Sequence, residues 1–375
     1  MIYFDNSATT GVKPREVIVS VNKALTSLSA NPGRSGHNKA IAAAEAIFKA
    51  RENVADFFSA DGAEQVIFTP GCTSAINYVL KGVLKRGDHV IVSSLEHNAV
   101  MRPIHSMGID YSVAEVSLYD DEITLKNFEA LIRENTKMIF CTGASNVIGK
   151  ILPLEAIGRL AKKYKIFFSV DAAQIAGLIE IDMKKFNIDY LCVAGHKGLY
   201  APMGVGVLIA RAPILKTVIE GGTGSNSKSL KNGTDIPEDF ESGTVNLPGI
   251  LGLSAGIDFV RKKGIKNIYT HEMRLITRLY NKLSKNKNII LYNKPEANKY
   301  VPLLSFNVNR LQSAKTAELL NKYNIAVRGG LHCAPSAHKV IGTLEDGTVR
   351  ISPSLFNSEM EIDFLVRALW KIKNI

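Results

Sequence analysis

The sequence predicts an α/β fold in which a mostly parallel sheet is covered by helices on both faces, followed by a smaller α+β region. From residue 37 to about 212, short runs rich in β-branched and aromatic residues alternate with amphipathic helical stretches, a pattern typical of strands buried on both faces. Beyond residue 250, helical stretches lead into shorter strand-like runs. A chain of 375 residues with 46% hydrophobic content is long enough for a substantial core.

The alternation can be followed element by element. A first helix is expected over residues 37–58, where apolar residues recur at helical spacing, and a short strand follows over 64–70. The later elements repeat this rhythm: a helix over 74–87, strands over 89–94 and 137–145, a helix over 154–165, and strands over 166–173, 190–197 and 205–210.

Residues 221–249 break this rhythm. They are rich in Gly, Ser, Asn and Pro and predict a long irregular segment, and such segments inside a compact protein are often functional. The smaller region is then expected from helices between about 250 and 286, a final helix from Ser358, and three strand-like runs, VPLLSFNV at 301–308, IAVRGG at 325–330 and TVRISP at 348–353.

The charge of the chain is strongly basic, with a formal net charge of +11. The lysine and arginine residues are scattered, and their densest clusters, RKKGIK at 261–266 and KNKN at 285–288, lie among helical or turn residues. A solvated lysine-rich surface explains this pattern better than nucleic-acid binding does, so no nucleic-acid partner is expected. An anionic small molecule or an acidic protein partner would fit the charge equally well.

The four cysteines, Cys72, Cys141, Cys192 and Cys333, form no CxxC pair and no zinc-ligand spacing with histidine. We therefore expect neither a metal site nor a disulfide framework. The amino terminus has no basic segment followed by an apolar stretch, and no apolar run approaches the length of a membrane span. These features favour a protein of the reducing cytoplasm with no membrane association.

Polar residues recur where the predicted strands end. In an open α/β sheet, ligands bind where the carboxyl ends of the strands meet the following loops. The residues at these ends are Gly71, Cys72 and Thr73, Glu96, His97 and Asn98, Ser145 and Asn146, Asp171 with Gln174, and His196 with Lys197. Because they gather at one edge of successive strands, they predict a single site.

Lys197 stands between two strand-like runs, where a lysine without a partner is rarely buried. A desolvated lysine has a lowered amine pKa and can form a Schiff base with a carbonyl. The standard partner of such a lysine is pyridoxal phosphate, whose ring nitrogen is held protonated by a carboxylate, and Asp171 is placed for that role. The TPGCTSAIN segment at 69–77, which opens a helix, would suit the phosphate.

Each of these residues also has a purely structural alternative. Thr73 could be an ordinary helix N-cap, His97 a hydrogen-bonded structural residue and Asp171 a cap at the strand end. The joint appearance of these residues in register favours function over the separate structural alternatives.

Motifs of one family then appear in order along nearly the whole chain. They are YFDNSATT at 3–10, NPGRSGH at 31–37, EHNAV at 96–100, SNVIG at 145–149, VDAAQ at 170–174, GHKGLYAPMGVG at 195–206, ESGTVNLPGI at 241–250, VRGGLHCAP at 327–335 and GTVRISP at 347–353. On these motifs the chain resembles the class V, fold-type I enzymes that depend on pyridoxal phosphate, specifically the cysteine desulfurase family. The resemblance implies the architecture of aspartate aminotransferase, with a large cofactor-binding domain over 15–257 and a small α+β domain formed by 1–14 and 258–375.

The resemblance also implies roles for individual residues. Lys197 resembles the Schiff-base lysine, Asp171 the partner of the ring nitrogen, and His97 the residue stacked over the ring. The other implied cofactor contacts are Gln174 at the phenolic oxygen with Asn146 nearby, Thr73 and His196 at the phosphate with Gly71 and Cys72 in the same cup, and Thr223, in the GGTGSNS loop at 221–227, from the second subunit of a homodimer. Arg350 resembles the residue that grips the substrate carboxylate, with Asn146 and Arg328 beside it.

Two positions of the phosphate cup depart from the family. Ala194 and Cys72 stand where related enzymes usually carry a hydroxyl residue. Both changes would remove hydrogen bonds to the phosphate, so either the cofactor is held more weakly or other groups complete the cup.

Cys333 is the candidate nucleophile. It follows Gly329 and Gly330 and neighbours Arg328 and His332, and a partly exposed thiol in a positive environment favours the thiolate. The structural alternative is a small hydrophobe buried in a turn. The short HCA context of this cysteine resembles the SufS-like branch of the family.

The resemblance implies that L-cysteine is converted to L-alanine while its sulfur is carried as a persulfide on Cys333. Lys197 would move the Cα proton and His97 would assist in proton transfer. An acceptor protein or scaffold would collect the sulfur, for iron–sulfur clusters, thiolated tRNA or cofactors. Selenocysteine lyase and another class V enzyme, such as a transaminase or an epimerase, are the alternatives among enzymes. A catalytically idle, cofactor-binding scaffold is the alternative outside them.

Overall fold

The structure is a computed structural model that describes residues 1–33, 35–224 and 227–372. Arg34 of the NPGRSGH motif and Ser225 and Asn226 of the GGTGSNS loop therefore lie outside the described residues. In the part of the chain that the structure describes, none of the helices is both long and apolar enough to span a membrane.

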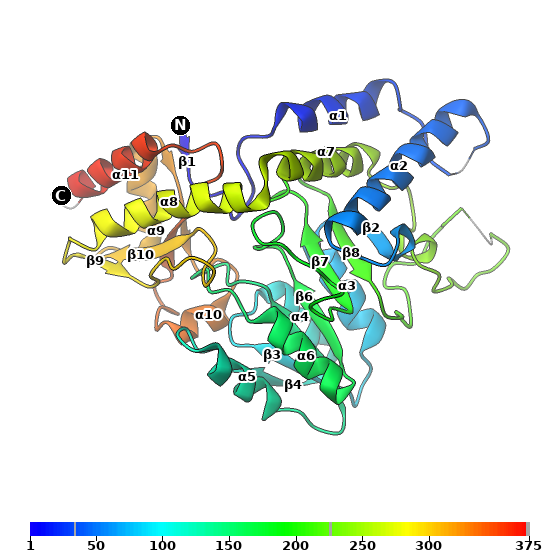
Figure 1. The fold of residues 1–375 in the computed structure, drawn as a ribbon, viewed down its shortest axis with the longest axis horizontal. Helices are drawn as coiled ribbons and strands as arrows, with labels where there is room; N and C mark the ends of the chain where they lie inside the picture. Colours follow the sequence, from blue (N-terminus) through cyan, green and yellow to red (C-terminus); the bar gives the residue numbers. More distant parts are fainter. Residues whose placement is uncertain (34, 225–226, 373–375) are drawn as a thin grey trace.

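A central sheet, to which the described residues contribute seven strands, forms the middle of the molecule (Figure 1). In spatial order these strands are β2 (Val66–Thr69), β8 (Gly206–Ala210), β7 (Tyr190–Ala194), β6 (Phe167–Asp171), β5 (Thr136–Thr142), β3 (His89–Ser93) and β4 (Asp110–Ala114). Only β8 runs against the others, because it pairs antiparallel with both β2 and β7. The mostly parallel sheet predicted from the sequence is confirmed. The reversal of β8 follows from the short connection over 195–205, since a parallel crossover needs a dozen residues or more.

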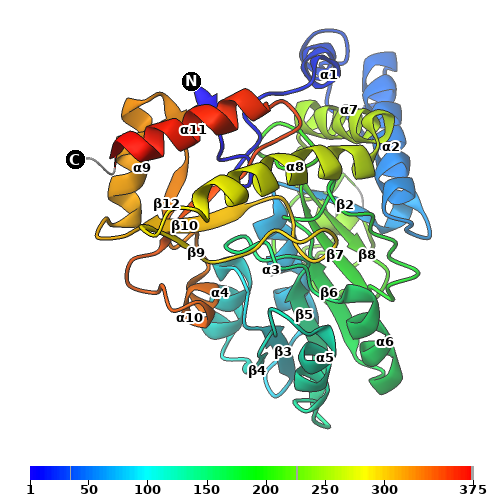
Figure 2. The ribbon, with the colours of Figure 1, turned by 60° about the vertical axis from the view of Figure 1, so that its left-hand side comes forward.

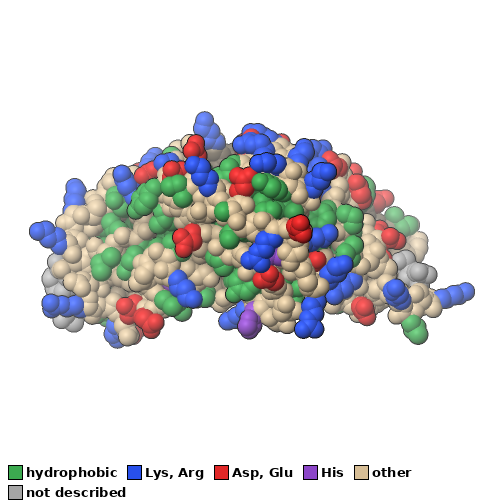
Figure 3. Space-filling model, turned by 90° about the horizontal axis from the view of Figure 1, so that it is seen from below, with side chains coloured by type: hydrophobic (Ala, Val, Ile, Leu, Met, Phe, Trp, Pro, Cys, Tyr) green, Lys and Arg blue, Asp and Glu red, His purple; other side chains and the backbone are tan. Residues whose placement is uncertain are grey.

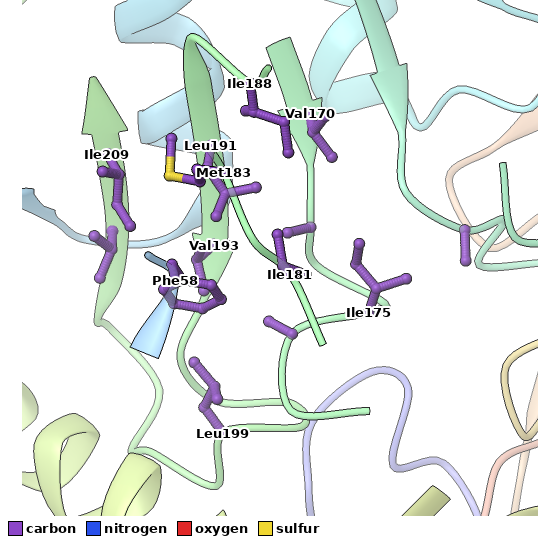
Figure 4. Close-up of a cluster of buried hydrophobic side chains, with 14 of the residues drawn as sticks. Phe58, Val170, Ile175, Ile181, Met183, Ile188, Leu191, Val193, Leu199 and Ile209 are labelled. Carbon is purple, nitrogen blue, oxygen red and sulfur yellow. The ribbon is translucent and has the colours of Figure 1, made fainter. Parts of the chain in front are cut away.

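Helices cover both faces of this sheet, and the strands alternate between them. The helices α3 (Cys72–Val83) and α4 (Asn98–Met107) pack on one face, and the other face carries α2 (Asn38–Phe57), α5 (Asp121–Glu129), α6 (Leu154–Tyr164) and α7 (Leu247–Lys263). In β7, Leu191 and Val193 enter the core beneath α2 and α7, whereas Cys192 enters the core beneath α3. Figure 4 shows the first of these cores, where Leu191 and Ile209 lie close to Met183.

The sequence prediction named no element before residue 37 and none between 95 and 136. The structure has α1 (Arg15–Thr26), which lies along α7 (Figure 1), and then α4, β4 and α5. The strand β4 is an edge strand whose Tyr111 and Val113 face solvent, so it lacks the continuous apolar run of a central strand. Pro103 inside α4 similarly obscures its helical pattern.

The irregular segment predicted over 221–249 is confirmed for its described part. Between Ala210 and Leu247, the only regular element among the described residues is the 3-10 helix Glu238–Phe240. A second 3-10 helix, Ala63–Gln65, precedes β2. The last part of the irregular segment packs against the sheet, because the Phe68 N–H of β2 donates to Glu241 Oε1 at 2.6 Å and Phe240 is buried in the core beneath α3.

The C-terminal part of the chain builds a second sheet, which is antiparallel. Its strands are, in spatial order, β12 (Arg328–Gly330), β13 (Thr348–Ile351), β10 (Leu304–Val308) and β9 (Ile289–Leu291). The helices of this part are α8 (Ile265–Leu283), α9 (Ser313–Lys322), α10 (Pro335–Val340) and α11 (Glu359–Ile372). The first residues of the chain join it, because β1 (Ile2–Tyr3) pairs parallel with β11 (Ile325–Ala326). Figures 1 and 2 accordingly show β1 beside the C-terminal part of the chain, near α11.

The second sheet has its own apolar core, which includes Phe4, Leu275 and Phe306. The core of the large sheet nevertheless extends to Val301 and Leu303, so the two parts also pack against each other. The helix α7 runs without interruption across residue 257. The domain boundaries that the sequence suggested stay a prediction.

The basic residues are not gathered into one patch on the face seen in Figure 3. There, lysine and arginine side chains are spread over the whole face, with acidic and hydrophobic side chains between them. This distribution matches a solvated lysine-rich surface of the kind the sequence predicted.

Candidate active site

A cavity of 260 Å³ lies at the carboxyl ends of the central strands. Predicted site residues that line it are Gly71, Cys72, Thr73, His97, Asn146, Asp171, Gln174, His196 and Lys197. Its other lining residues are Pro70, Ser74, Ile76, Ala99, Thr142, Ala173 and Ala194. The topology brings these residues together because β5, β6 and β7 are parallel neighbours in register, so that their carboxyl ends coincide.

One wall of the cavity is the amino-terminal end of helix α3. The N-cap of this helix is Gly71, and no side chain caps its free N–H groups, so Thr73 is not the N-cap that the structural alternative required. Gly206 lets strand β8 approach this turn, because a Cβ atom on Gly206 would come within 2.6 Å of the Gly71 carbonyl carbon. An uncapped helix N-terminus that opens into a cavity is an anion-binding arrangement.

Asp171 ends β6 on the floor of the cavity and is 5% exposed. Its Oδ1 atom accepts hydrogen bonds from the Ala173 N–H at 2.9 Å and from the Cys72 thiol at 3.3 Å. Among the described residues, both bonds to this carboxylate go to Oδ1. Oδ2 is therefore the oxygen that remains for a ligand.

Lys197 follows β7 and lies between Asp171 and the C-terminal arginines. Burial lowers the pKa of its amine, an effect that Asp171 opposes and that Arg350 reinforces. In the described part of the chain, no carboxylate forms an ion pair with Lys197. Desolvation thus favours the neutral form of the amine, which is the form that a nucleophilic or basic lysine needs.

The backbone next to Lys197 is anchored by the amino-terminal segment. The carbonyl oxygen of His196 accepts a hydrogen bond from the Thr10 N–H at 3.0 Å, and the hydroxyls of Thr9 and Thr10 lie 3.2 Å from the same oxygen. Lys13 Nζ donates to Thr10 Oγ1 at 2.6 Å and lies 3.4 Å from this carbonyl. Burial lowers the pKa of Lys13 to about 8. Donors from one short segment therefore fix the peptide that precedes Lys197.

Two histidines line the cavity in neutral form. Burial, opposed by Asp171 and reinforced by Lys197, lowers the pKa of His97. The Nδ1 atom of His97 accepts a bond from the Ala99 N–H at 3.0 Å, so the proton of the neutral ring is assigned to Nε2. Burial, Lys197 and Lys13 together lower the pKa of His196 to about 4, and its buried Nδ1 has no partner among the described residues.

Asn146 connects the cavity with the second sheet. Its Nδ2 donates to the His332 carbonyl at 2.7 Å, and its own carbonyl accepts from Arg350 Nη1 at 2.9 Å. Arg350 is 1% exposed and also donates from Nη2 to Asp5 Oδ1 at 2.8 Å, while its Nε has no partner among the described residues. The guanidinium predicted to grip a substrate carboxylate is already held by Asp5 and by the Asn146 backbone carbonyl, and Nε is its nitrogen without a partner among the described residues.

Cys333 stands on a turn with unusual backbone geometry. His332 and Cys333 have φ angles of 50° and 58°, and two successive non-glycine residues in the left-handed region are strained. The turn is held because the Cys333 carbonyl accepts from the Asn98 N–H at 2.8 Å and the His332 ring bonds to the Thr348 carbonyl at 3.0 Å.

The Cys333 side chain is exposed, with Arg328 Nη2 3.7 Å from its sulfur. It lines a second cavity, of 430 Å³, together with Thr73 and His97, which also line the cavity of Lys197. The exposed Cys333 and the half-buried Lys197 are thus neighbours across shared residues, although the first belongs to the C-terminal part of the chain and the second follows a strand of the central sheet.

The structure shows the surroundings of two further predicted residues, Gln174 and Thr223, within this chain. Gln174 Nε2 donates to the Ser7 carbonyl at 3.2 Å, so part of its hydrogen-bonding capacity is used within the chain. Thr223 does not line the Lys197 cavity; it lines cavities elsewhere, one of them beside Arg51 and Glu241.

The sequence reasoning missed Asp5 and Lys13, and it placed Glu96 at the edge of the sheet without giving it a role. Glu96 is 0% exposed, and its Oε1 accepts from Ser93 Oγ and from the Thr142 N–H. Burial raises its pKa to about 8. Glu96 precedes His97 directly, and Asp5 lies in the YFDNSATT motif, so both stood in stretches already marked as important. Nothing local to the sequence indicates which distant group each of the three contacts.

The comparison with protein families agrees with this geometry. The model of the family described as aminotransferase class V matches residues 2–365. The chain therefore belongs to the class V aminotransferase family.

Individual relatives narrow the comparison. The probable cysteine desulfurase of Borreliella burgdorferi is 34% identical over 391 residues, which cover 99% of this chain and 92% of that protein. The apo structure of the cysteine desulfurase from Thermococcus onnurineus NA1 matches with a TM-score of 0.90 and 31% identity, covering 100% of this chain and 95% of that chain. The cysteine desulfurase CsdA of Escherichia coli, in its S-sulfonic acid form, matches with a TM-score of 0.88 and 25% identity, covering 99% and 94%. The resemblance to cysteine desulfurases is confirmed.

Cysteine desulfurases of this family are pyridoxal phosphate enzymes, and the residues of the cavity fit that cofactor. The uncapped N-terminus of α3 suits a phosphate, and the free Oδ2 atom of Asp171 suits a protonated ring nitrogen. The amine of Lys197 is available because no carboxylate among the described residues pairs with it. Each part of the cofactor thus meets a group of matching chemistry.

Proposed function

We propose that this protein is a pyridoxal phosphate-dependent cysteine desulfurase of the SufS-like branch. It converts L-cysteine to L-alanine and carries the sulfur as a persulfide on Cys333. The observation that carries the proposal is the shared wall between the two cavities. Thr73 and His97 line both the cavity of Lys197 and the cavity of the exposed Cys333 thiol.

Different residues of the cavity would bind different parts of the cofactor. Lys197 would bind it covalently, Asp171 Oδ2 would hold the ring nitrogen, and His97 would stack on the ring. The phosphate would take the N–H groups at the start of α3, with Thr73 and His196 beside them. Bound in this way, the cofactor would supply an electron sink that acidifies the Cα–H bond of the substrate.

Proton transfer would fall to Lys197 and His97. The amine of Lys197, whose pKa is lowered by burial, takes the Cα proton at Nζ. The Nε2–H of neutral His97 is the second mobile proton of the site. Arg350, Arg328 and Asn146 would hold the substrate carboxylate, and Gln174 would contact the phenolic oxygen of the cofactor.

Sulfur transfer would occur at Cys333. Its thiolate attacks the sulfur of the substrate, so that an S–S bond forms while the Cβ–S bond breaks and its electron pair remains with the carbon. Protonation of that carbon yields alanine, and the enzyme keeps a persulfide. Cysteine plus thiolate therefore balances alanine plus persulfide without any external oxidant.

The proposal also covers the oligomeric state, the sulfur acceptor and the location of the enzyme. Thr223 lies away from the Lys197 cavity of its own chain, which supports its contribution to the site of a partner in a homodimer. An acceptor protein would collect the sulfur from the exposed turn. We place the enzyme in the cytoplasm.

The test is alanine and sulfide production from L-cysteine with a reductant, for wild type and Cys333→Ala. We expect the variant to lose about 100-fold or more of sulfide release and to keep the visible absorption of the bound cofactor. Cys141→Ala is the control, because Cys141 is buried in β5 and outside both cavities. Equal activity of wild type and Cys333→Ala would contradict the proposal and favour a selenocysteine lyase, a transaminase or an epimerase. Cofactor binding without any product in the wild type would favour an idle scaffold.

A further inference from the structure

The Cys72 side chain makes a contact that the sequence did not predict. Cys72 is the first residue of α3 and was expected to contribute to the phosphate cup. In the structure its Sγ lies 3.3 Å from Asp171 Oδ1 and donates a hydrogen bond to it. The side chain thus contacts the floor of the cavity, while the backbone at the helix start remains available to an anion.

This contact follows from the packing of α3 on the sheet. In β6, Phe168 and Val170 enter the core on the α2 side, so alternation sends the Asp171 side chain to the α3 side. The start of α3 therefore lies over Asp171, with Cys192 of β7 beside it in register. A short donor at the first helical position is the residue type that can reach the carboxylate.

The two donors fix the orientation of the carboxylate. The Ala173 N–H and the Cys72 thiol both bond to Oδ1, and no bond among the described residues reaches Oδ2. Without the thiol, Oδ1 would accept a single hydrogen bond, from the Ala173 N–H. The orientation of the carboxylate would then be less constrained. The thiol therefore helps to keep Oδ2 directed at the cavity.

The thiol is also held in the donor form. Burial, followed by the nearby charge of Asp171, raises the pKa of Cys72 well above its usual value. A protonated thiol donates to a carboxylate but is a poor nucleophile. The Lys197 cavity thus contains a protonated thiol, Cys72, that donates a hydrogen bond to Asp171. The neighbouring cavity contains an exposed thiol, Cys333.

We infer that Cys72 is a positioning residue that orients Asp171 toward the ring nitrogen of the cofactor, in place of the phosphate contact that the sequence suggested. The inference rests on the proposed function, since it requires a pyridine ring in the cavity. It assigns the family-divergent cysteine a role that acts through Asp171 and leaves the phosphate to the backbone of α3, Thr73 and His196.

The test measures cofactor affinity rather than turnover. Apo-protein is reconstituted with pyridoxal phosphate, with pyridoxal, which lacks the phosphate, and with 1-deazapyridoxal phosphate, in which carbon replaces the ring nitrogen. The variants are Cys72→Ala, Cys72→Ser and the control Cys192→Ala. Cys192→Ala removes a thiol that is buried beside Asp171 but makes no hydrogen bond to it. Circular dichroism confirms that each variant folds.

We expect Cys72→Ala to weaken binding of pyridoxal phosphate by about three- to tenfold, the effect of one net hydrogen bond. The same loss should appear with pyridoxal and disappear with the deaza analogue. Cys72→Ser keeps a donor and should bind within about twofold of wild type, as should the Cys192→Ala control.

Three results would overturn the inference. A loss with pyridoxal phosphate that vanishes with pyridoxal would assign Cys72 to the phosphate. An equal loss with the deaza analogue would assign it to packing of the cavity, and no loss in Cys72→Ala would leave it without a role in binding. Failure of the wild type to bind any of the three compounds would instead overturn the proposed function, and this inference with it.

Discussion

The floor of the cavity and the Cys333 turn are built in opposite ways. On the floor, Asp171, Cys72 and Glu96 are held by neighbouring strands and helices, and burial raises the pKa of Cys72 and of Glu96. The turn is exposed, strained at two successive residues, and tied by bonds from Asn98 and Asn146 of the central sheet region. The floor therefore contains groups whose pKa is raised by burial, whereas the turn holds an exposed thiol on a restrained surface segment.

The largest expected effect is on the floor. Asp171→Asn replaces the charge without changing the shape, so the ring nitrogen of the cofactor would no longer be held protonated. We expect a loss of about 10²–10⁴-fold in alanine formation. Asp189→Asn is the matched control, because Asp189 precedes β7 at the opposite end of the sheet and accepts one backbone bond, from the Phe168 N–H. Similar losses in both variants would show that the effect is structural.

The second-largest effect is expected in the reactivity of the thiols, which should differ between the cavity floor and the Cys333 turn. Cys333 is exposed, whereas burial raises the pKa of Cys72, Cys141 and Cys192. With iodoacetamide at neutral pH, we expect Cys333 to react about 100-fold faster than the other three in the folded protein. Peptide mass spectrometry over time measures the four rates. Equally fast modification of Cys72 would contradict the distinction between floor and turn.

The pH dependence of stability tests the burial of Glu96. Its folded pKa, about 8, exceeds its ordinary value of 4.5, so the folded state binds the extra proton between these values and stability falls as pH rises through this window. Glu96→Gln removes this titrating group. Between pH 5 and pH 8, we expect the free energy of unfolding of wild type to fall by roughly 3 kcal/mol more than that of Glu96→Gln. Urea unfolding at both pH values measures it, and parallel curves would show that Glu96 ionises freely.

The smallest effect concerns the ion pair behind the turn. Asp5→Asn leaves the buried Arg350 without its partner, which should lower the free energy of unfolding by about 2 kcal/mol. Asp110→Asn is the control. It breaks an ion pair of nearly equal length, 2.9 Å from Arg133, whose side chains are about half exposed, and should cost less than about 1 kcal/mol. Denaturant unfolding of both variants decides whether burial distinguishes the two pairs.

The floor was predictable from the sequence because it depends on local patterns. Asp171 and Lys197 each end an apolar run, and parallel strands align such ends whatever the loops do. The orientation of side chains was not predictable to the same degree. The sequence placed Cys72 in the phosphate cup as a departure that removes a hydrogen bond, and only the packing of α3 over β6 shows that its thiol reaches Asp171.

The surroundings of the turn depend on contacts between distant segments. Nothing near Cys333 in the sequence indicates that Asn98 and Asn146 hold its turn, or that Asp5 occupies Arg350. Edge strand β4 and helix α4 escaped prediction for a related reason, since solvent exposure and an internal proline weaken the periodicity on which such predictions depend.

The placement of the first residues has a consequence for how the protein matures on the ribosome. Asp5 and Arg350, which pair directly, are 345 residues apart, and β1 pairs with β11 near residue 325. At roughly 5–20 residues per second, the start of the chain waits on the order of 20–70 s before its partners are synthesised. The central sheet can be formed by then, but Arg350 and the Cys333 turn cannot be. Assembly of the Cys333 turn beside the Lys197 cavity is therefore a late event of biosynthesis.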